Sequence, residues 1–319
     1  MSNPLVANKH LPQLNIIRAI ASLAVAIFHL GGKAMPGFRY GWLGVEMFFV
    51  LTGFVICWSL PIRYSIKDFP VFFAKRLARV EPPYIVSIAI ILALAYFVYK
   101  DTAHIQLQNV LFHLAYINNF FGNNYLSPVY WTLGIEFQFY ILIGILFPFI
   151  FYSEKIAIVS LVLLNIFSFY SHLKYTTVFG VMPYFTFGMV VYMYKNKIIE
   201  KLAFFILSII NMGYLLYLMG FPGTVAAIIA VGIIVFLSTS NTIIDFFSKI
   251  SFSLYLTHDI VGSQLVVFVG SLFYVKTIYT KALSFSIGLL AAICFAYLFY
   301  IIVEKKALAF SKRFRYAIR

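Results

Sequence analysis

Long apolar segments, separated by short polar ones, follow one another along the whole chain. Runs of about 18 to 22 mainly apolar residues predict ten membrane-spanning helices, because a helix needs about 20 such residues to cross the hydrocarbon of a bilayer. We expect these helices at residues 13–32, 42–60, 82–99, 131–152, 156–173, 177–194, 202–219, 221–238, 249–272 and 282–303. Residues 105–121 are also apolar, but His113, Asn118 and Asn119 interrupt them. An interfacial or re-entrant segment is expected there, and the alternative is an eleventh membrane-spanning helix.

The composition agrees with an all-α, polytopic integral membrane protein. Of the 319 residues, 63% are hydrophobic and 11% are charged, whereas soluble domains are about half apolar and a quarter charged. The sequence shows no internal repeat or flexible linker, so we expect one transmembrane domain over residues 1–319. Both cysteines lie in predicted spans and no metal-ligand spacing occurs, so neither a disulfide framework nor a metal site is predicted.

Positive charges set the expected orientation of the helices. With the N-terminus inside, 17 of the 24 lysines and arginines fall in inner segments, six fall in outer segments, and Arg18 lies within the first span. Inner loops typically carry such an excess, so both termini are expected in the cytoplasm. The net charge of +14 then reflects topology and attraction to anionic lipids, and no nucleic-acid partner is expected.

Two ionisable residues stand in the first predicted span. Arg18 and His29 are 11 residues apart, so on a helix they share one face and are about 16 Å apart along the axis. Ionisable groups in membrane helices usually face protein or water and mark functional sites. His29 is a candidate general base for an attacking hydroxyl. The alternative is a packed histidine bonded to a neighbouring helix.

Three further polar residues are candidate site residues. Two are expected near the depth of His29, and one is expected near the middle of the membrane. Glu46 and Glu136 are both expected near the outer ends of their helices, where they could meet His29 at one level. Glu46 could orient the imidazole as the acid of a triad does, or it could be an interfacial carboxylate. Glu136 could take part in catalysis or mark a helix start. His258 could support the site or hold two helices together.

A pair of arginines precedes the third predicted helix. Arg76 and Arg79 are spaced i,i+3, so their side chains project together on a helical turn. Paired guanidinium groups suit phosphate recognition, although ordinary positive charge on the inner side is the alternative. Pro82 and Pro83 predict that the helix begins just after this pair.

Five stretches in order give the chain a resemblance to a known family. They are RAIASLAVAIFH at 18–29, GVEMFFVLTGFVI at 44–56, RLAR at 76–79, WTLGIEFQFY at 131–140 and SFSLYLTH at 251–258. Together they resemble the signature stretches of the acyltransferase 3 family, whose members acylate cell-surface glycans and some other hydroxyl acceptors. Thr52 and Thr132 stand where the family has serines, and Glu46 stands where an aspartate is common. Phe252 replaces a tyrosine, and Asp259 follows His258 where proline is usual.

The resemblance implies a membrane O-acyltransferase without the SGNH extension that some members carry. Its acyl-CoA co-substrate, usually acetyl-CoA, would come from the cytoplasm, and no cofactor would be bound permanently. The acceptor would be a carbohydrate hydroxyl at the outer side of a bacterial inner membrane, with glycan-assembly proteins as further partners. The expected catalytic residues are His29, Glu46 and Glu136, the expected acyl-CoA ligands are Arg18, Arg76 and Arg79, and the expected supporting residues are Thr52, Trp131, Tyr255 and His258.

Other function classes remain open from the sequence. Buried ionisable residues also occur in proton-coupled transporters and flippases, although the repeated halves of many transporters are not seen. A non-enzymatic membrane scaffold is a third class. The sequence does not distinguish O-antigen, capsule, exopolysaccharide, lipid-linked sugar or a small natural product as acceptor, nor direct transfer from a covalent intermediate.

Overall fold

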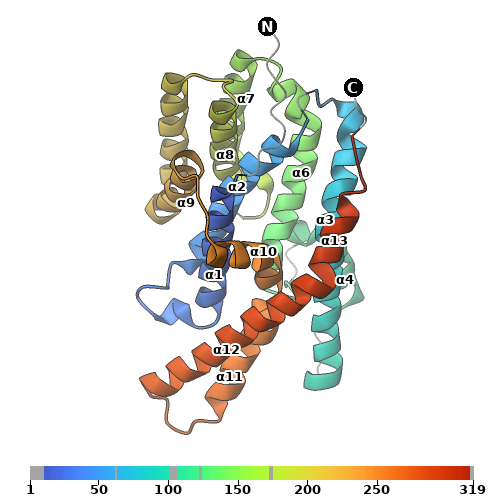
Figure 1. The fold of residues 1–319 in the computed structure, drawn as a ribbon, viewed down its shortest axis with the longest axis vertical. Coiled ribbons are helices and arrows are strands. Elements are labelled where there is room, and N and C mark those ends of the chain that lie inside the picture. Colours follow the sequence, from blue (N-terminus) through green and yellow to red (C-terminus); the bar gives the residue numbers. More distant parts are fainter. Residues whose placement is uncertain (1–10, 62, 101–105, 122–123, 172–174, 317–319) are drawn as a thin grey trace.

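The computed structural model describes residues 11–61, 63–100, 106–121, 124–171 and 175–316 of the chain. Within these residues every regular element is helical (Figure 1). The longer helices are α1 (Gln13–His29), α2 (Gly44–Ser59), α3 (Phe69–Ala93), α6 (Tyr130–Ile150), α7 (Glu154–Ser171), α8 (Met182–Lys195), α9 (Lys201–Phe236), α10 (Thr242–Thr257) and α12 (Ile278–Phe299). The shorter ones are α4 (Leu107–Leu114), α5 (Asn118–Phe121), α11 (Gln264–Ser271) and α13 (Lys305–Ser311).

Six of the described helical stretches are long and apolar enough to cross a membrane. The expectation of ten spans is therefore not confirmed. α1 has 17 residues, at the lower end of the range for a crossing, and α8 has 14, below that range. Residues 107–121 form the two short helices α4 and α5, in agreement with the predicted break. Residues 1–10 and 317–319 lie outside the described part, so the cytoplasmic location of both termini stays a prediction.

The predicted start of the third helix is wrong. α3 begins at Phe69, after a capping box in which Ser65 and Asp68 satisfy each other's backbone groups. Pro82 and Pro83 lie inside this helix, which membrane helices tolerate when neighbouring groups compensate the lost backbone bonds. Arg76 and Arg79 are consequently part of α3 itself, and helix geometry fixes their common direction.

α9 turns back on itself at a glycine, which explains why two spans were predicted there. Gly220 has φ 79° and ψ 178°, a conformation that side-chain-bearing residues rarely adopt. Lys195, the last residue of α8, donates to the carbonyl oxygen of Val235 near the end of α9 at 3.0 Å. The last turn of α9 therefore lies beside the end of α8, six residues before α9 begins.

Four helices form the centre of the fold. α2 packs along α8 and α1, while α1 also packs along α10. α11 and α12 form an antiparallel pair that extends away from this centre, and α13 lies beside α3 (Figure 1). The arrangement surrounds α1 and α2 with other helices, so side chains on their inner faces meet protein rather than lipid.

The crossing of α2 and α8 depends on glycine. A Cβ atom on Gly188 would overlap the carbonyl oxygen of Val50 and lie 2.6 Å from the amide nitrogen of Phe54. Gly53, on the facing side, would meet the backbone of Phe185 in the same way. Backbone atoms cannot move aside as a flexible side chain can. Gly53, the glycine of the FFVLTGF stretch, is therefore required for the close packing of α2 on α8.

Gly188→Ala is expected to destabilise the protein by about 1–3 kcal/mol, the usual cost of overpacking. Gly232→Ala serves as the control, because no atom lies within 4 Å of a Cβ there. That change should be neutral or slightly stabilising, since alanine is the better helix former. Thermal unfolding of the detergent-solubilised variants measures both. Equal melting temperatures for the two variants would contradict the close crossing.

Candidate active site

The inner face of α1 carries both of its ionisable side chains into cavities of the protein. Arg18 lines a cavity of about 130 Å³, and His29 lines a second cavity of about 380 Å³. Val25, seven residues after Arg18, lines the second cavity as well. The helix face that Arg18 and His29 share therefore meets protein along its length.

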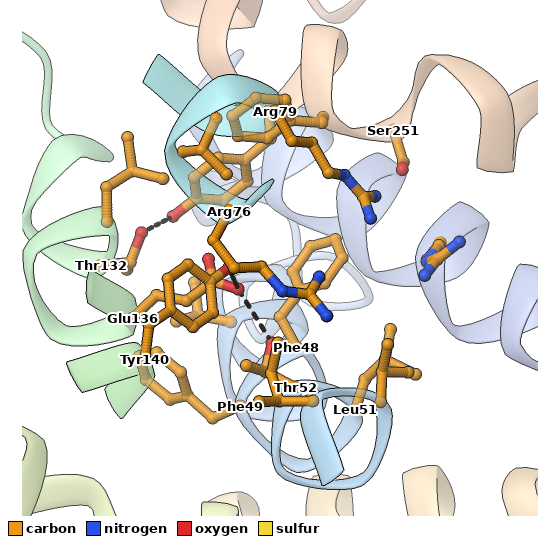
Figure 2. Close-up of a pocket in the computed structure, with 18 residues that line it drawn as sticks. Phe48, Phe49, Leu51, Thr52, Arg76, Arg79, Thr132, Glu136, Tyr140 and Ser251 are labelled. Atoms are coloured by element: carbon orange, nitrogen blue, oxygen red, sulfur yellow. Dashed lines mark hydrogen bonds between the residues drawn. The ribbon is translucent and has the colours of Figure 1, made fainter. Parts of the chain in front are cut away.

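The first cavity, here called the arginine cavity, holds three guanidinium groups. Arg18 comes from α1, and Arg76 and Arg79 extend from α3 into the same space (Figure 2). A donor on Arg76 bonds to the hydroxyl of Ser59, whereas no hydrogen bond from Arg18 or Arg79 to a described residue is seen. Guanidinium groups without protein partners are available to an anion.

Glu136 is the carboxylate of the arginine cavity. Its Oε1 accepts hydrogen bonds from Thr52 at 3.1 Å and from Tyr140 at 2.5 Å. The Tyr140 ring lies 5.9 Å from the Arg76 guanidinium carbon. Three arginines and one glutamate give the lining a net charge of +2 with all four groups ionised, so the cavity favours an anionic ligand.

The second cavity, here called the histidine cavity, has a different lining. His29 and Glu46 share it with Trp42, Trp131 and Tyr175. Glu46 is 1% exposed, and its Oε1 accepts from the Tyr175 hydroxyl at 3.1 Å. Its other oxygen, Oε2, is buried without a hydrogen-bond partner among the described residues. One polar acceptor is therefore left unsatisfied beside the cavity.

His29 has a second histidine beside it. The ring of His258 lies 5.3 Å from the ring of His29, centroid to centroid, and is fully buried. Nδ1 of His258 is 2.9 Å from the carbonyl oxygen of Leu254. Because a carbonyl can only accept, Nδ1 carries the hydrogen in this bond and Nε2 of the neutral ring is an acceptor. Nε2 has no partner in the described structure.

A short wall separates the two cavities. Val45 and Tyr255 line both of them. The Tyr255 hydroxyl is 2.7 Å from the hydroxyl of Thr132 and donates to the carbonyl oxygen of Val129 at 3.3 Å. The two cavities therefore adjoin at Val45 and Tyr255, between the arginines and His29.

The structure places the expected residues in two groups rather than one. Glu136 lies with the arginines, so the expectation that it meets His29 and Glu46 at one level is wrong. No hydrogen bond joins Glu46 to His29 among the described residues. The physical reason is helix geometry: Glu136 is five residues beyond Trp131, which rotates it by about 140° and moves it about 7.5 Å along the axis. Trp131 faces the histidine cavity and Glu136 faces the arginine cavity.

The remaining expected residues also divide between these cavities. Thr52 bonds to Glu136, and Tyr255 forms the wall. Sequence reasoning missed three residues that contact the site, Ser59, Tyr140 and Tyr175. Tyr140 follows Glu136 by four residues, so helical spacing could have found it. Tyr175 comes from the connection between α7 and α8, and only the fold brings it to Glu46.

Comparison with known proteins identifies the family. The family model described as an acyltransferase domain, acyltransferase 3, matches residues 11–301. The chain belongs to this family. Membership supports an acyltransferase rather than a transporter or a scaffold. All five stretches that carry the resemblance lie within the matched residues.

Similar proteins bear acetyltransferase names. The chain is 30% identical over 138 residues to the "Putative acetyltransferase ORF330" of Acidianus two-tailed virus, a match that covers 42% of this chain and 40% of that protein. It is 28% identical over 162 residues to the O-acetyltransferase OatA of Staphylococcus aureus, covering 46% of this chain and 26% of OatA. The matches thus span less than half of each relative. No solved structure matches the chain.

Proposed function

We propose that this membrane acyltransferase transfers an acyl group, normally acetyl, from acyl-CoA to a hydroxyl group of a carbohydrate. One observation carries the proposal. A cavity with three arginines and a cavity with a histidine adjoin each other across Val45 and Tyr255. An anionic donor with a long neutral arm and a hydroxyl acceptor together require such a pair of neighbouring sites.

The arginine cavity suits the phosphates of coenzyme A. Arg18 and Arg79 have no hydrogen-bond partner in the described protein, and bidentate guanidinium contacts to phosphate are strong. The helical distance from Arg18 to His29 is about 16 Å, which is of the order of an extended pantetheine arm. The thioester would reach His29 by passing Tyr255. Glu136, held by Thr52 and Tyr140, would keep the arginine side chains separated and oriented.

His29 would act as the general base. It takes the proton from the acceptor hydroxyl while the hydroxyl oxygen attacks the thioester carbonyl carbon. The C–S bond then breaks, and the sulfur of coenzyme A leaves with the proton that His29 returns. His258 would position this base: its free Nε2 can accept a hydrogen bond from the N–H of His29 and so turn the lone pair of His29 toward the acceptor.

The distribution of charge supports the proposed sidedness. The connection between α2 and α3, next to the arginine-bearing helix, carries the exposed residues Arg63 and Lys67. Lys75 packs over the ring of Tyr316 near the basic end of the chain. An excess of lysine and arginine favours the cytoplasmic side, where acyl-CoA is made. The acceptor, in this proposal, is a surface or lipid-linked glycan met at the outer side of a bacterial inner membrane.

Acetyl-CoA and acetyl-pantetheine, which lacks the nucleotide phosphates, together test the donor site. We expect Arg79→Met to raise the KM for acetyl-CoA about 10- to 150-fold, the range for loss of a charged hydrogen bond of about 1.5–3 kcal/mol. Its KM for acetyl-pantetheine should stay the same. Release of the free thiol by purified protein in lipid nanodiscs, with a methyl glycoside present as the hydroxyl acceptor, gives both values.

Arg63→Met is the matched control for this test, because Arg63 is exposed and lies outside the arginine cavity. It should change neither KM. Equal effects of Arg79→Met on both donors would show that Arg79 does not bind phosphate. Failure of the wild-type protein to release thiol from either donor would refute the proposed function.

A further inference from the structure

The histidine cavity contains more binding groups than an acetyl group and a catalytic base require. Besides His29, it presents the rings of Trp42, Trp131 and Tyr175 and the carboxylate of Glu46. Its volume of about 380 Å³ falls in the usual range of small-molecule sites. The chemistry of these additional groups indicates which further ligand the histidine cavity binds.

The unpaired oxygen of Glu46 points to a hydrogen-bonding ligand. Glu46 is 1% exposed, and only Oε1 has a partner, the Tyr175 hydroxyl. A buried polar atom without a partner costs free energy, so native structures rarely keep one without a reason. A ligand hydroxyl at Oε2 would satisfy it. The apolar tail of a lipid or an acyl chain would leave it unsatisfied.

Tyr175 is a second, independent indication. Its φ is 58°, in the left-handed region that costs a side-chain-bearing residue about 1–2 kcal/mol. This backbone places its ring edge-to-face against Trp131, with 5.2 Å between centroids, and its hydroxyl on Glu46. Burial, followed by the nearby Glu46, raises the pKa of Tyr175, so its hydroxyl stays a donor. Strain of this kind is concentrated at ligand sites.

We propose that the histidine cavity is the acceptor subsite and binds a single neutral sugar ring. The C–H face of the ring stacks on Trp131, and one ring hydroxyl donates to Oε2 of Glu46. A second hydroxyl lies at His29, where it is acylated. This inference rests on the proposed function and assigns Glu46 to the acceptor rather than to the orientation of His29.

Tryptophan fluorescence can test the subsite directly, because the chain has only three tryptophans. Two of them, Trp42 and Trp131, line the histidine cavity, whereas Trp58 stacks on Phe54 with 5.4 Å between ring centroids. In a Trp58→Phe background, all tryptophan emission comes from the cavity. The probes are the methyl glycosides of glucose, galactose, mannose and N-acetylglucosamine, with cyclohexanol as a ring of similar size that carries one hydroxyl.

At least one glycoside should change the emission saturably, and cyclohexanol should not. Glu46→Gln should raise the Kd of that glycoside about 2- to 10-fold, as expected for loss of one hydrogen bond, because the amide nitrogen in place of Oε2 cannot accept. Tyr175→Phe, which removes one hydroxyl, should weaken binding in the same direction. Glu200→Gln makes the same chemical change at an exposed position and should leave the Kd unchanged.

An emission spectrum that no glycoside changes overturns the inference, as does an equal Kd in the wild type and the Glu46 and Tyr175 variants. Acetyl-CoA binding, measured on the same samples, separates this failure from failure of the proposed function. Protein that binds acetyl-CoA and no glycoside keeps its donor site and loses the sugar subsite. Protein that binds a glycoside and no acetyl-CoA keeps the subsite and refutes the acyl transfer.

Discussion

His29→Ala is expected to lower kcat for acetyl transfer about 10²- to 10⁴-fold, the range that a positioned general base contributes. The side chain lines the histidine cavity and makes no hydrogen bond to another described residue, so its removal breaks no internal polar contact. The KM for acetyl-CoA should change little, because the proposed phosphate site is about 16 Å away along α1. Thiol release and acetylated product, measured together, give kcat and KM.

Lys281→Ala is the control for the His29 variant. Lys281 is exposed, lies in α12 and does not line the histidine cavity. Its loss should leave both constants unchanged. If His29→Ala retained the wild-type kcat, the general-base role would be excluded, and the histidine would have to be regarded as a packing residue.

His258→Leu should lower kcat about 10- to 100-fold while the KM for acetyl-CoA stays the same. The basis for this magnitude is the effect of removing a group that orients a functional histidine. Leucine fills similar space but cannot accept a hydrogen bond from His29, so the base would lose its fixed orientation. The ring distance of 5.3 Å and the free Nε2 of His258 are the observations behind this expectation.

His258→Gln provides the comparison that separates positioning from packing. Both variants lose the Nδ1 bond to Leu254, but glutamine retains an acceptor near the position of Nε2. We expect glutamine to recover most of the wild-type kcat. Equal losses in the two variants, or a lower melting temperature that parallels activity, would assign His258 a structural role only.

Local pattern was sufficient for the fold class, and it singled out the ionisable residues that line the two cavities. Hydropathy identifies apolar helices because each helix satisfies its own backbone hydrogen bonds and needs only an apolar exterior in lipid. The start of α3 was missed because prolines such as Pro82 and Pro83 are typical of the first turn of a helix. The structure instead begins this helix at Phe69, directly after the capping box of Ser65 and Asp68. The hairpin in α9 was anticipated, since glycine and proline at its turn divide the apolar run.

The sequence by itself determined that this chain is a helical membrane protein, that Arg18 and His29 share a helix face, and that Arg76 and Arg79 project together. These properties follow from composition and from the 3.6-residue period of a single helix. Only the tertiary structure decided that Glu136 joins the arginines, that Tyr175 holds Glu46, and that His258 lies beside His29. Such contacts depend on the relative depth and rotation of different helices. Close backbone approaches, such as those at Gly53 and Gly188, fix these relations. The spacing of residues within one helix carries no information about them.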